Sequence, residues 1–282
     1  MKNSVYLILL CLFLLTGKVS AQSHSCCSSS ATGTFAMLSG DPSFISAHAA
    51  PEPIVFTPAK GKMITYKVAD GPEANAFFVK ADNKSDKYIF IFHEWWGLND
   101  HIKQEAERFA SDFPGVNILA LDLYDGQLAT NSDDAAKIMG TIQNERVLAI
   151  TKGALDYVGT TASIQTIGWC VGGGWSLQAA IMFGKQAKGC VMYYGMPEKD
   201  PKRLEMLKAP VLGIFALRDK WITKPIVDEF EKQMKELRKP ISISFFDADH
   251  AFANPSNPTF DETATAKARM IALGFLKGNF DK

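Results

Sequence analysis

One short segment of the 282-residue chain places a cysteine in a setting suited to nucleophilic chemistry. Residues 164–167 have the composition of a buried strand, Gly168-Trp169-Cys170-Val171-Gly172-Gly173 follows directly, and a helical pattern covers residues 175–183. Glycines two positions either side of a nucleophile let strand and helix approach closely in such a turn. The helix N-terminus behind Cys170 favours a thiolate. The segment indicates a nucleophile elbow, although a cysteine between glycines taken alone is more typical of a packing residue.

Asp219 and His250 could complete a catalytic triad with Cys170. Each lies in a loop directly after a strand-like run, and the order cysteine, aspartate, histidine is the order of nucleophile, acid and base that the α/β-hydrolase topology imposes. His250 would exchange a proton with the thiol and then with the leaving group, while Asp219 would orient its ring. Asp249 is an alternative acid, but adjacent side chains in an extended segment diverge, which favours Asp219.

The loop His93-Glu94-Trp95-Trp96-Gly97 follows another strand-like run and supplies an ionisable pair. The carboxylate of Glu94 would alter how readily Cys170 ionises, unless it is an ordinary solvated loop residue. The histidine that opens the loop is more typical of a residue buried beneath it. Backbone N–H groups of Val171 and Trp95 are the expected oxyanion hole.

Strand-like and helix-like segments alternate after residue 60. We expect strands at 63–68, 74–80, 88–92, 116–121, 164–168, 189–194, 210–216 and 241–246, and helices at 99–112, 144–158, 175–183, 224–237 and 264–276. This alternation is typical of a mostly parallel central sheet with helices on both faces, whose site lies at the carboxyl ends of the strands. It predicts an α/β-hydrolase fold over residues 60–282.

The first 59 residues predict a targeting segment and an arm. Lys2 precedes an apolar run at residues 5–15, and Val19-Ser20-Ala21 offers small residues to a signal peptidase, so residues 1–21 are the predicted signal peptide. A retained anchor is the alternative, but the run is about half of the ~20 residues required. We expect export to the periplasm or beyond, without stable membrane insertion after signal removal. Residues 22–59, rich in Ser, Ala and Pro, predict a loosely attached arm without a catalytic role.

Charge and cysteine usage narrow the possible partners. The 30 basic and 30 acidic residues give a formal net charge of zero, which argues against sequence-independent binding to nucleic acid. Export would permit a disulfide among Cys26, Cys27, Cys170 and Cys190 without requiring one. His24 beside Cys26 and Cys27 is a weak metal motif, and we predict no metal site. The oligomeric state is not indicated.

These residues resemble the dienelactone hydrolase family from about Lys62 to Phe280. The matching segments are His93-Glu94-Trp95-Trp96-Gly97-Leu98-Asn99, Ala120-Leu121-Asp122-Leu123-Tyr124, the cysteine elbow, Tyr193-Tyr194-Gly195, Arg218-Asp219 and Asp249-His250-Ala251-Phe252. The resemblance implies a triad of Cys170, Asp219 and His250. It also implies that Glu94 contacts the resting cysteine and takes part in its activation, and that no cofactor is needed to cleave lactones or esters.

The chain differs from the family in the residues that bind the substrate carboxylate. Family members grip it with arginines, one of them shortly after the catalytic histidine, whereas Ala251-Phe252-Ala253-Asn254 follows here and the loop after Tyr124 has no arginine before Arg146. A carboxylated substrate is therefore not expected. An apolar pocket for a bulky ester is predicted instead, and its predicted residues are Trp96, Trp169, Tyr124, Trp221 and Phe252. Ordinary packing in the core is an equal alternative for each of these side chains.

The leading hypothesis is an exported, cofactor-independent hydrolase that cleaves a small-molecule lactone or carboxylic ester through an acyl-cysteine intermediate. A carbohydrate or xenobiotic esterase or thioesterase of the same fold is the first alternative. A non-catalytic binding protein that keeps the fold and a redox protein that uses Cys170 are the others.

Overall fold

The computed structural model describes residues 31–69 and 71–280. The predicted signal peptide and the motif of His24, Cys26 and Cys27 lie outside these residues. Within the described part of the chain, no helix is long and apolar enough to cross a bilayer.

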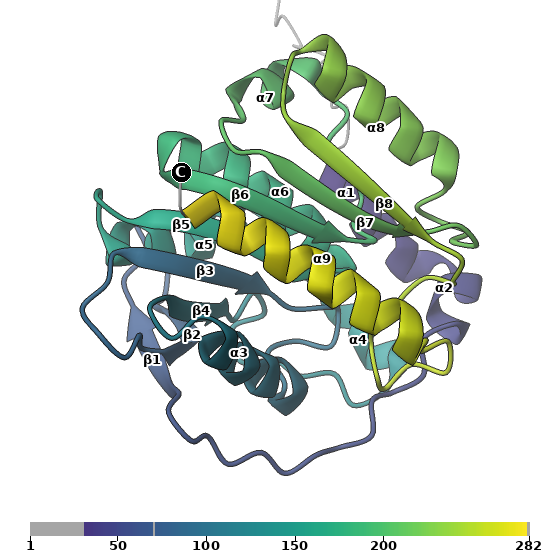
Figure 1. Cartoon of the computed structure of the whole chain (residues 1–282). Helices are drawn as coiled ribbons and strands as arrows, with labels where there is room; N and C mark the ends of the chain where they lie inside the picture. The colour runs from purple at the N-terminus through teal and green to yellow at the C-terminus, as the bar shows by residue number, and fades with distance from the viewer. Residues whose placement is uncertain (1–30, 70, 281–282) are drawn as a thin grey trace, which may run out of the picture.

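Eight strands of the described chain form one sheet with the order β1-β2-β4-β3-β5-β6-β7-β8 (Figure 1). β1 and β2 are antiparallel to their neighbours, and every pair from β4 to β8 is parallel. The strands are β1 (Lys62–Tyr66), β2 (Ala74–Val79), β3 (Lys87–Phe92), β4 (Asn117–Leu121), β5 (Ser163–Trp169), β6 (Ala187–Tyr193), β7 (Val211–Ala216) and β8 (Ile241–Phe246). The predicted mostly parallel sheet is confirmed.

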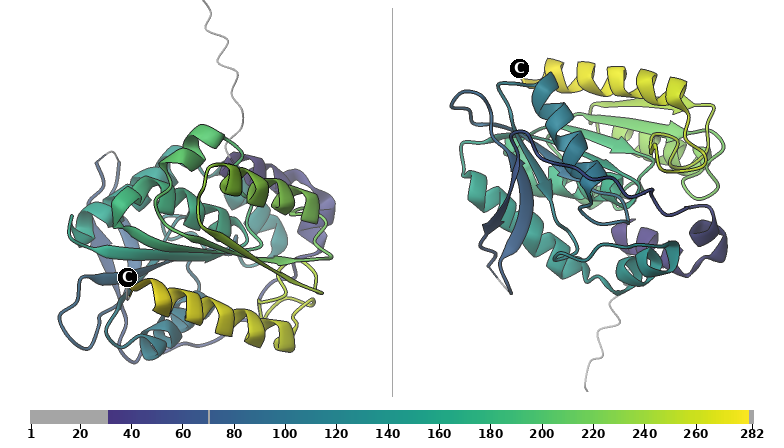
Figure 2. Two further views of the ribbon diagram at one scale, coloured as in Figure 1. Left: turned by 45° about the horizontal axis from the view of Figure 1, so that its top comes forward. Right: turned by 90° about the horizontal axis from the view of Figure 1, so that it is seen from below.

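Helices cover both faces of this sheet. They are α1 (Ala31–Ala36), η1 (Met37–Gly40), α2 (Pro42–Ser46), α3 (Asp100–Asp112), α4 (Ser132–Thr141), α5 (Asn144–Val158), α6 (Val171–Phe183), η2 (Gly184–Gln186), α7 (Pro201–Met206), α8 (Lys224–Glu236) and α9 (Glu262–Phe280). α3 and α9 lie on one face, and α5, α6 and α8 on the other (Figure 2). The predicted α/β-hydrolase architecture is confirmed.

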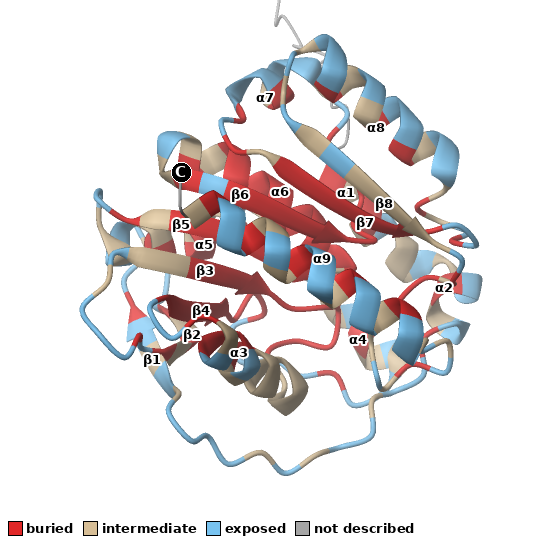
Figure 3. Cartoon of the chain, in the orientation of Figure 1, coloured by how far each residue is buried: buried red, intermediate tan, exposed pale blue. Residues whose placement is uncertain are grey.

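The core lies along the central strands. All six residues of β7 and all five of β4 are buried, whereas β8 at the edge is only half-buried (Figure 3). A strand that helices cover on both faces is apolar at nearly every position. These strands could therefore be predicted from the sequence as continuous apolar runs. The parallel strands point their carboxyl ends to one edge, where their following loops meet.

The arm predicted to be loosely attached is packed against the domain over residues 31–48. Phe35 and Phe44 are fully buried, α1 contacts α6, and η1 contacts α4. Asp41 begins α2 by accepting the N–H of Ser43 at 2.8 Å, and Pro42 occupies the first turn. For residues 31–48 the prediction of a loose arm was wrong, because average composition hides a few large apolar side chains that are enough to anchor a short segment.

Candidate active site

Cys170 lies at the turn between β5 and α6, in a backbone conformation that few non-glycine residues adopt. Its φ is 55° and its ψ is −123°. A Cβ on Gly168 would overlap the carbonyl of Gly172, and one on Gly172 would overlap the carbonyls of Phe92 and His93. Only glycine fits at both positions, so the two glycines permit a strained turn that projects Cys170 from the sheet edge.

Asp219 and His250 form a hydrogen-bonded pair beside this turn. Asp219, in the loop after β7, accepts the Nδ1–H of His250 at 2.6 Å through Oδ2. Its Oδ1 accepts the N–H groups of Trp221 and Ile222, each at 2.9 Å. Burial raises the pKa of Asp219, but the charge of His250 and these hydrogen bonds outweigh it and leave the pKa below its ordinary value. The alternative acid Asp249 instead pairs with Arg218.

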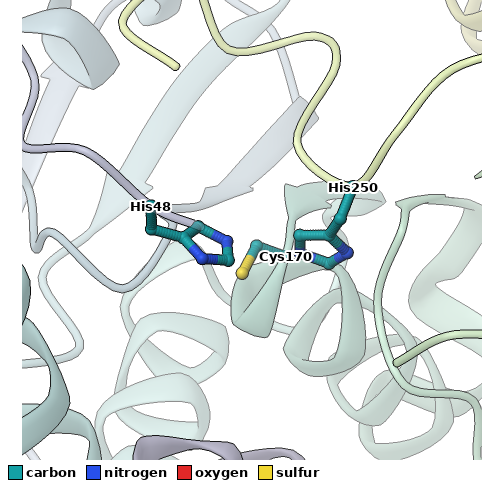
Figure 4. A group of neighbouring side chains, drawn as sticks. All are labelled: His48, Cys170 and His250. Carbon is teal, nitrogen blue, oxygen red and sulfur yellow. The ribbon is translucent and has the colours of Figure 1, made fainter. Parts of the chain in front are cut away.

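Cys170 faces His250 at the centre of the site. Sγ of Cys170 and one ring nitrogen each of His250 and His48 lie within 4.8 Å of one another, and Figure 4 shows the sulfur between the two rings. The backbone N–H groups of Val171 and Trp95 are directed at Sγ. Burial raises the pKa of the Cys170 thiol well above its ordinary value, and the charge of Glu94 raises it further. The resting cysteine is therefore a neutral thiol.

Glu94 is buried near Cys170 among polar groups. It accepts hydrogen bonds from the side-chain amide of Asn254 and, at 3.4 Å, from the hydroxyl of Tyr194. Burial raises the pKa of Glu94 to about 7, although His250 and both hydrogen bonds lower it in part. A carboxyl that titrates near neutral pH beside a thiol is suited to proton transfer.

His93, the other ionisable residue of that loop, is held in place by hydrogen bonds to the backbone. It is fully buried, its Nδ1–H donates to the carbonyl of Glu94 at 2.6 Å, and its Nε2 accepts the N–H of Leu123 at 3.1 Å. The two bonds tie the Glu94 loop to the segment after β4.

His48, which no sequence motif indicated, lies beside Cys170 because the N-terminal segment packs there. The His48 ring packs against Trp95 with centroids 4.9 Å apart and against His250 at 5.3 Å. Burial, and then the charge of His250, lower the pKa of His48 to about 3, so its ring is neutral. The Asp-Pro-Ser signal at residues 41–43 would have predicted α2, but no spacing in the sequence relates His48 to Cys170.

A cavity of about 410 Å³ adjoins this site and extends between the segment around residues 51–55 and the helices α3 and α9. Glu94 and Asn254 lie in its wall, together with the predicted pocket residues Trp96 and Trp169. Cys170 is 1% exposed and is not in this wall. A substrate carbonyl therefore reaches Sγ only when a neighbouring side chain or the N-terminal segment moves.

The other three predicted pocket residues lie outside the wall of this cavity. Tyr124 is buried against His93 with ring centroids 4.8 Å apart. Trp221 packs edge-on against His250 at 5.6 Å. Phe252 is fully buried between Tyr194 and Phe246, which is the arrangement of a core side chain.

Comparison with known proteins identifies the family. The profile of the dienelactone hydrolase family matches residues 74–280, which is most of the chain. The chain belongs to the dienelactone hydrolase family. It is accordingly a hydrolase of lactones or esters that acts on small molecules.

Two relatives and one solved structure illustrate this membership of the dienelactone hydrolase family. A carboxymethylenebutenolidase of a Pseudomonas species is 30% identical over 201 residues, covering 67% of this chain and 83% of that protein. The protein usf of Aquifex pyrophilus is 27% identical over 202 residues, covering 67% and 87%. A dienelactone hydrolase of Anabaena variabilis shares the fold with a TM-score of 0.58 at 17% identity, over 78% of this chain and 98% of that one.

Proposed function

We propose that this hydrolase cleaves a lactone or carboxylic ester by forming an acyl-cysteine at Cys170, with His250 as acid–base and Asp219 as its orienting partner. One observation carries the proposal. Sγ lies within 4.8 Å of a ring nitrogen of His250, and Nδ1 of the same ring is hydrogen-bonded to the buried carboxylate of Asp219. Nucleophile, base and orienting acid in that geometric sequence define acyl-transfer sites on many folds.

The reaction proceeds in two halves. Sγ bonds to the substrate carbonyl carbon, and the N–H groups of Val171 and Trp95 donate to the oxyanion. The C–O bond to the leaving alkoxide then breaks, and the alkoxide takes the proton that the thiol gave to Glu94, relayed through Nε2 of His250. In the second half His250 removes a proton from water, and the hydroxide attacks the thioester. Cys170 leaves as thiolate and takes that proton from His250, which restores the resting thiol.

Glu94 activates the resting thiol in this proposal. A neutral, buried thiol is a poor nucleophile, and Glu94 with a pKa of about 7 is the carboxylate placed to accept its proton. Asn254 and Tyr194 hold Glu94 in position through their hydrogen bonds. Proton transfer from Cys170 to Glu94 therefore precedes attack.

The cavity supports a neutral, bulky substrate rather than a carboxylated one. Its volume of about 410 Å³ suits a small organic molecule. Arg108 and Arg269 lie in its wall, and Glu105 forms ion pairs with both of them. Arg269 is already paired with Glu105 and with Asp112 at 2.7 Å. The pocket therefore offers no uncompensated guanidinium to a substrate carboxylate.

The test compares Cys170→Ala with the wild type on chromogenic aryl esters and unsubstituted lactones. We expect kcat/KM to fall by about a thousandfold or more, and mass spectrometry to find the acyl group on the Cys170 peptide of the wild type. Cys190→Ala, at the other described cysteine, is the matched control and should keep its activity. Saturable hydrolysis that survives Cys170→Ala refutes the assignment of the nucleophile.

We also propose that the enzyme is exported. Lys2, the apolar run at residues 5–15 and Val19-Ser20-Ala21 have the order of a signal peptide. N-terminal sequencing of the protein recovered from its native host should begin at residue 22. Recovery of a chain that still begins at Met1 would contradict this proposal.

A further inference from the structure

Two buried ring nitrogens near Cys170 have no hydrogen-bond partner in the described part of the chain. They are Nε2 of His48 and Nε2 of His250. A buried imidazole nitrogen without a partner is costly, so such atoms indicate a role that the protein retains. The proposed hydrolysis uses His250 and leaves His48 without a function.

The hydrogen bonds at the opposite nitrogens set both rings in the same tautomer. Nδ1–H of His48 donates to the carbonyl of Phe44 at 2.7 Å, and Nδ1–H of His250 donates to Asp219 at 2.6 Å. Each Nε2 is therefore a free acceptor. A histidine that ligates a metal almost always donates its other N–H to a carbonyl or carboxylate, which orients the ring and makes the ligating nitrogen more basic.

A thiol completes the set of donors. Sγ of Cys170 and one ring nitrogen of each histidine lie within 4.8 Å of one another, and all three residues are buried. Figure 4 shows the sulfur between the two rings. Two imidazoles and one thiolate suit Zn²⁺ and similar borderline cations, and three protein ligands leave a fourth tetrahedral position for water.

We propose that His48, Cys170 and His250 form a Zn²⁺ site. Binding converts the Cys170 S–H bond to an S–Zn bond and releases the proton to solvent. The metal blocks attack by Sγ, and this inhibitory effect rests on the proposed function, whereas metal binding does not.

Forming the site requires a small closure. Zinc lies about 2.0–2.1 Å from nitrogen and 2.3 Å from sulfur, so tetrahedral ligands are about 3.3–3.6 Å apart. The three donors, which lie within 4.8 Å of one another, must therefore approach by up to about 1.5 Å. His48 follows the short helix α2, outside the sheet that holds the other two ligands, and its movement supplies this closure. The bound metal would tie the N-terminal segment to the catalytic loops.

The experiment titrates the protein with Co²⁺ and Zn²⁺ in a Cys26→Ser, Cys27→Ser background, which removes the other thiols near His24. The near-ultraviolet thiolate-to-cobalt band reports a sulfur ligand, and the intensity of the visible bands reports tetrahedral geometry. We expect one Co²⁺ per chain, displacement by Zn²⁺, and a higher melting temperature with metal.

His48→Gln is the decisive variant. It should weaken metal binding by about a hundredfold or more, and Cys170→Ser should abolish the thiolate band. His101→Gln alters a partly exposed histidine and should leave binding unchanged. Circular dichroism of each variant checks its fold, and Cys170→Ser carries the test if His48→Gln does not fold.

Two outcomes overturn the proposal: no thiolate band in the background protein, or a band of equal affinity in His48→Gln. The hydrolysis assay then separates this proposal from the proposed function. Metal binding without Cys170-dependent hydrolysis refutes only the proposed function. Hydrolysis that Zn²⁺ does not inhibit, in a protein without the cobalt band, refutes only the metal site.

Discussion

Glu94 is a buried carboxyl, and its burial destabilises the folded chain when the carboxyl is charged. Burial raises its pKa from 4.5 to about 7, so between these values the folded chain holds a proton that the unfolded chain has lost. The free energy of unfolding therefore falls as pH rises through this window and stays low above it. Active sites commonly carry such a cost.

Glu94→Gln should stabilise the protein at high pH only. At pH 8 the free energy of unfolding should rise by about 2–4 kcal/mol, because an uncharged amide avoids the buried charge. At pH 4.5 most of this gain should vanish. Urea unfolding at both values measures the effect. Glu236→Gln, an exposed change on α8, is the control, and an equal gain for Glu94→Gln at both values would contradict the assignment.

The same carboxyl should set the pH dependence of hydrolysis. Below pH 7 Glu94 is protonated and does not accept the thiol proton, so kcat/KM of the wild type should rise with pH through about 7. Glu94→Gln should lose this limb and about a hundredfold or more in kcat/KM. Initial rates from pH 5 to 9 give the profile. If kcat/KM of Glu94→Gln still rises with pH through about 7, the rise is due to another ionisable group.

At the scale of elements, backbone contacts of the β5–α6 turn determine the position of Cys170. Cys170 N–H donates to the carbonyl of Tyr193 at 3.0 Å, which joins the turn to β6. Gly172 lies against the carbonyls that follow β3. Three neighbouring strands thus determine the position of one side chain, and any added atom at this crossing must displace backbone.

Gly172→Ala should be severely destabilising, with a loss of about 3 kcal/mol or more, because its methyl group would overlap two backbone carbonyls. Gly174→Ala is the matched control on the same helix, where the nearest heavy atom to a new Cβ is 3.4 Å away. Alanine there should be neutral or slightly stabilising. Urea unfolding of both variants measures the change in the free energy of unfolding. A similar change in Gly172→Ala and Gly174→Ala would contradict the packing argument.

At the scale of the whole molecule, the N-terminal segment of residues 31–48 covers the site at the carboxyl ends of the strands. The ring of Phe44 lies 5.2 Å from Trp95, 5.1 Å from Trp221 and 5.8 Å from His250. Trp221 also donates to Asp41 at 3.1 Å. One aromatic cluster thus joins the segment to the loops that hold the candidate triad, so access to Cys170 depends on this contact.

Phe44→Ala should open the site. Removing a buried phenylalanine costs about 3–5 kcal/mol, and because the segment is short, local release should precede global unfolding. Alkylation of Cys170 by iodoacetamide, followed on its peptide by mass spectrometry, should accelerate about tenfold or more. Met37→Ala, on the same segment but 65% exposed, is the control. An unchanged rate would show that the segment does not limit access.

Local patterns in the sequence determined the sheet, the elbow and the order of Cys170, Asp219 and His250. Each depends on short-range rules: apolar runs for buried strands, glycines where backbones cross, and polar residues in the loops after strands. The matched segments also predicted the family. The boundaries of the predicted helices and strands differ from those of the structure by only a few residues, whereas helices α1, α2, α4 and α7 were not predicted.

Only the tertiary structure decided which distant residues meet at Cys170. His48 precedes the cysteine by more than a hundred residues and reaches it because Phe44 and Trp95 pack together, a contact without periodicity in the sequence. The raised pKa of Glu94 likewise depends on burial by several elements at once. Local rules determine elements and their order, whereas burial and long-range packing depend on the whole chain.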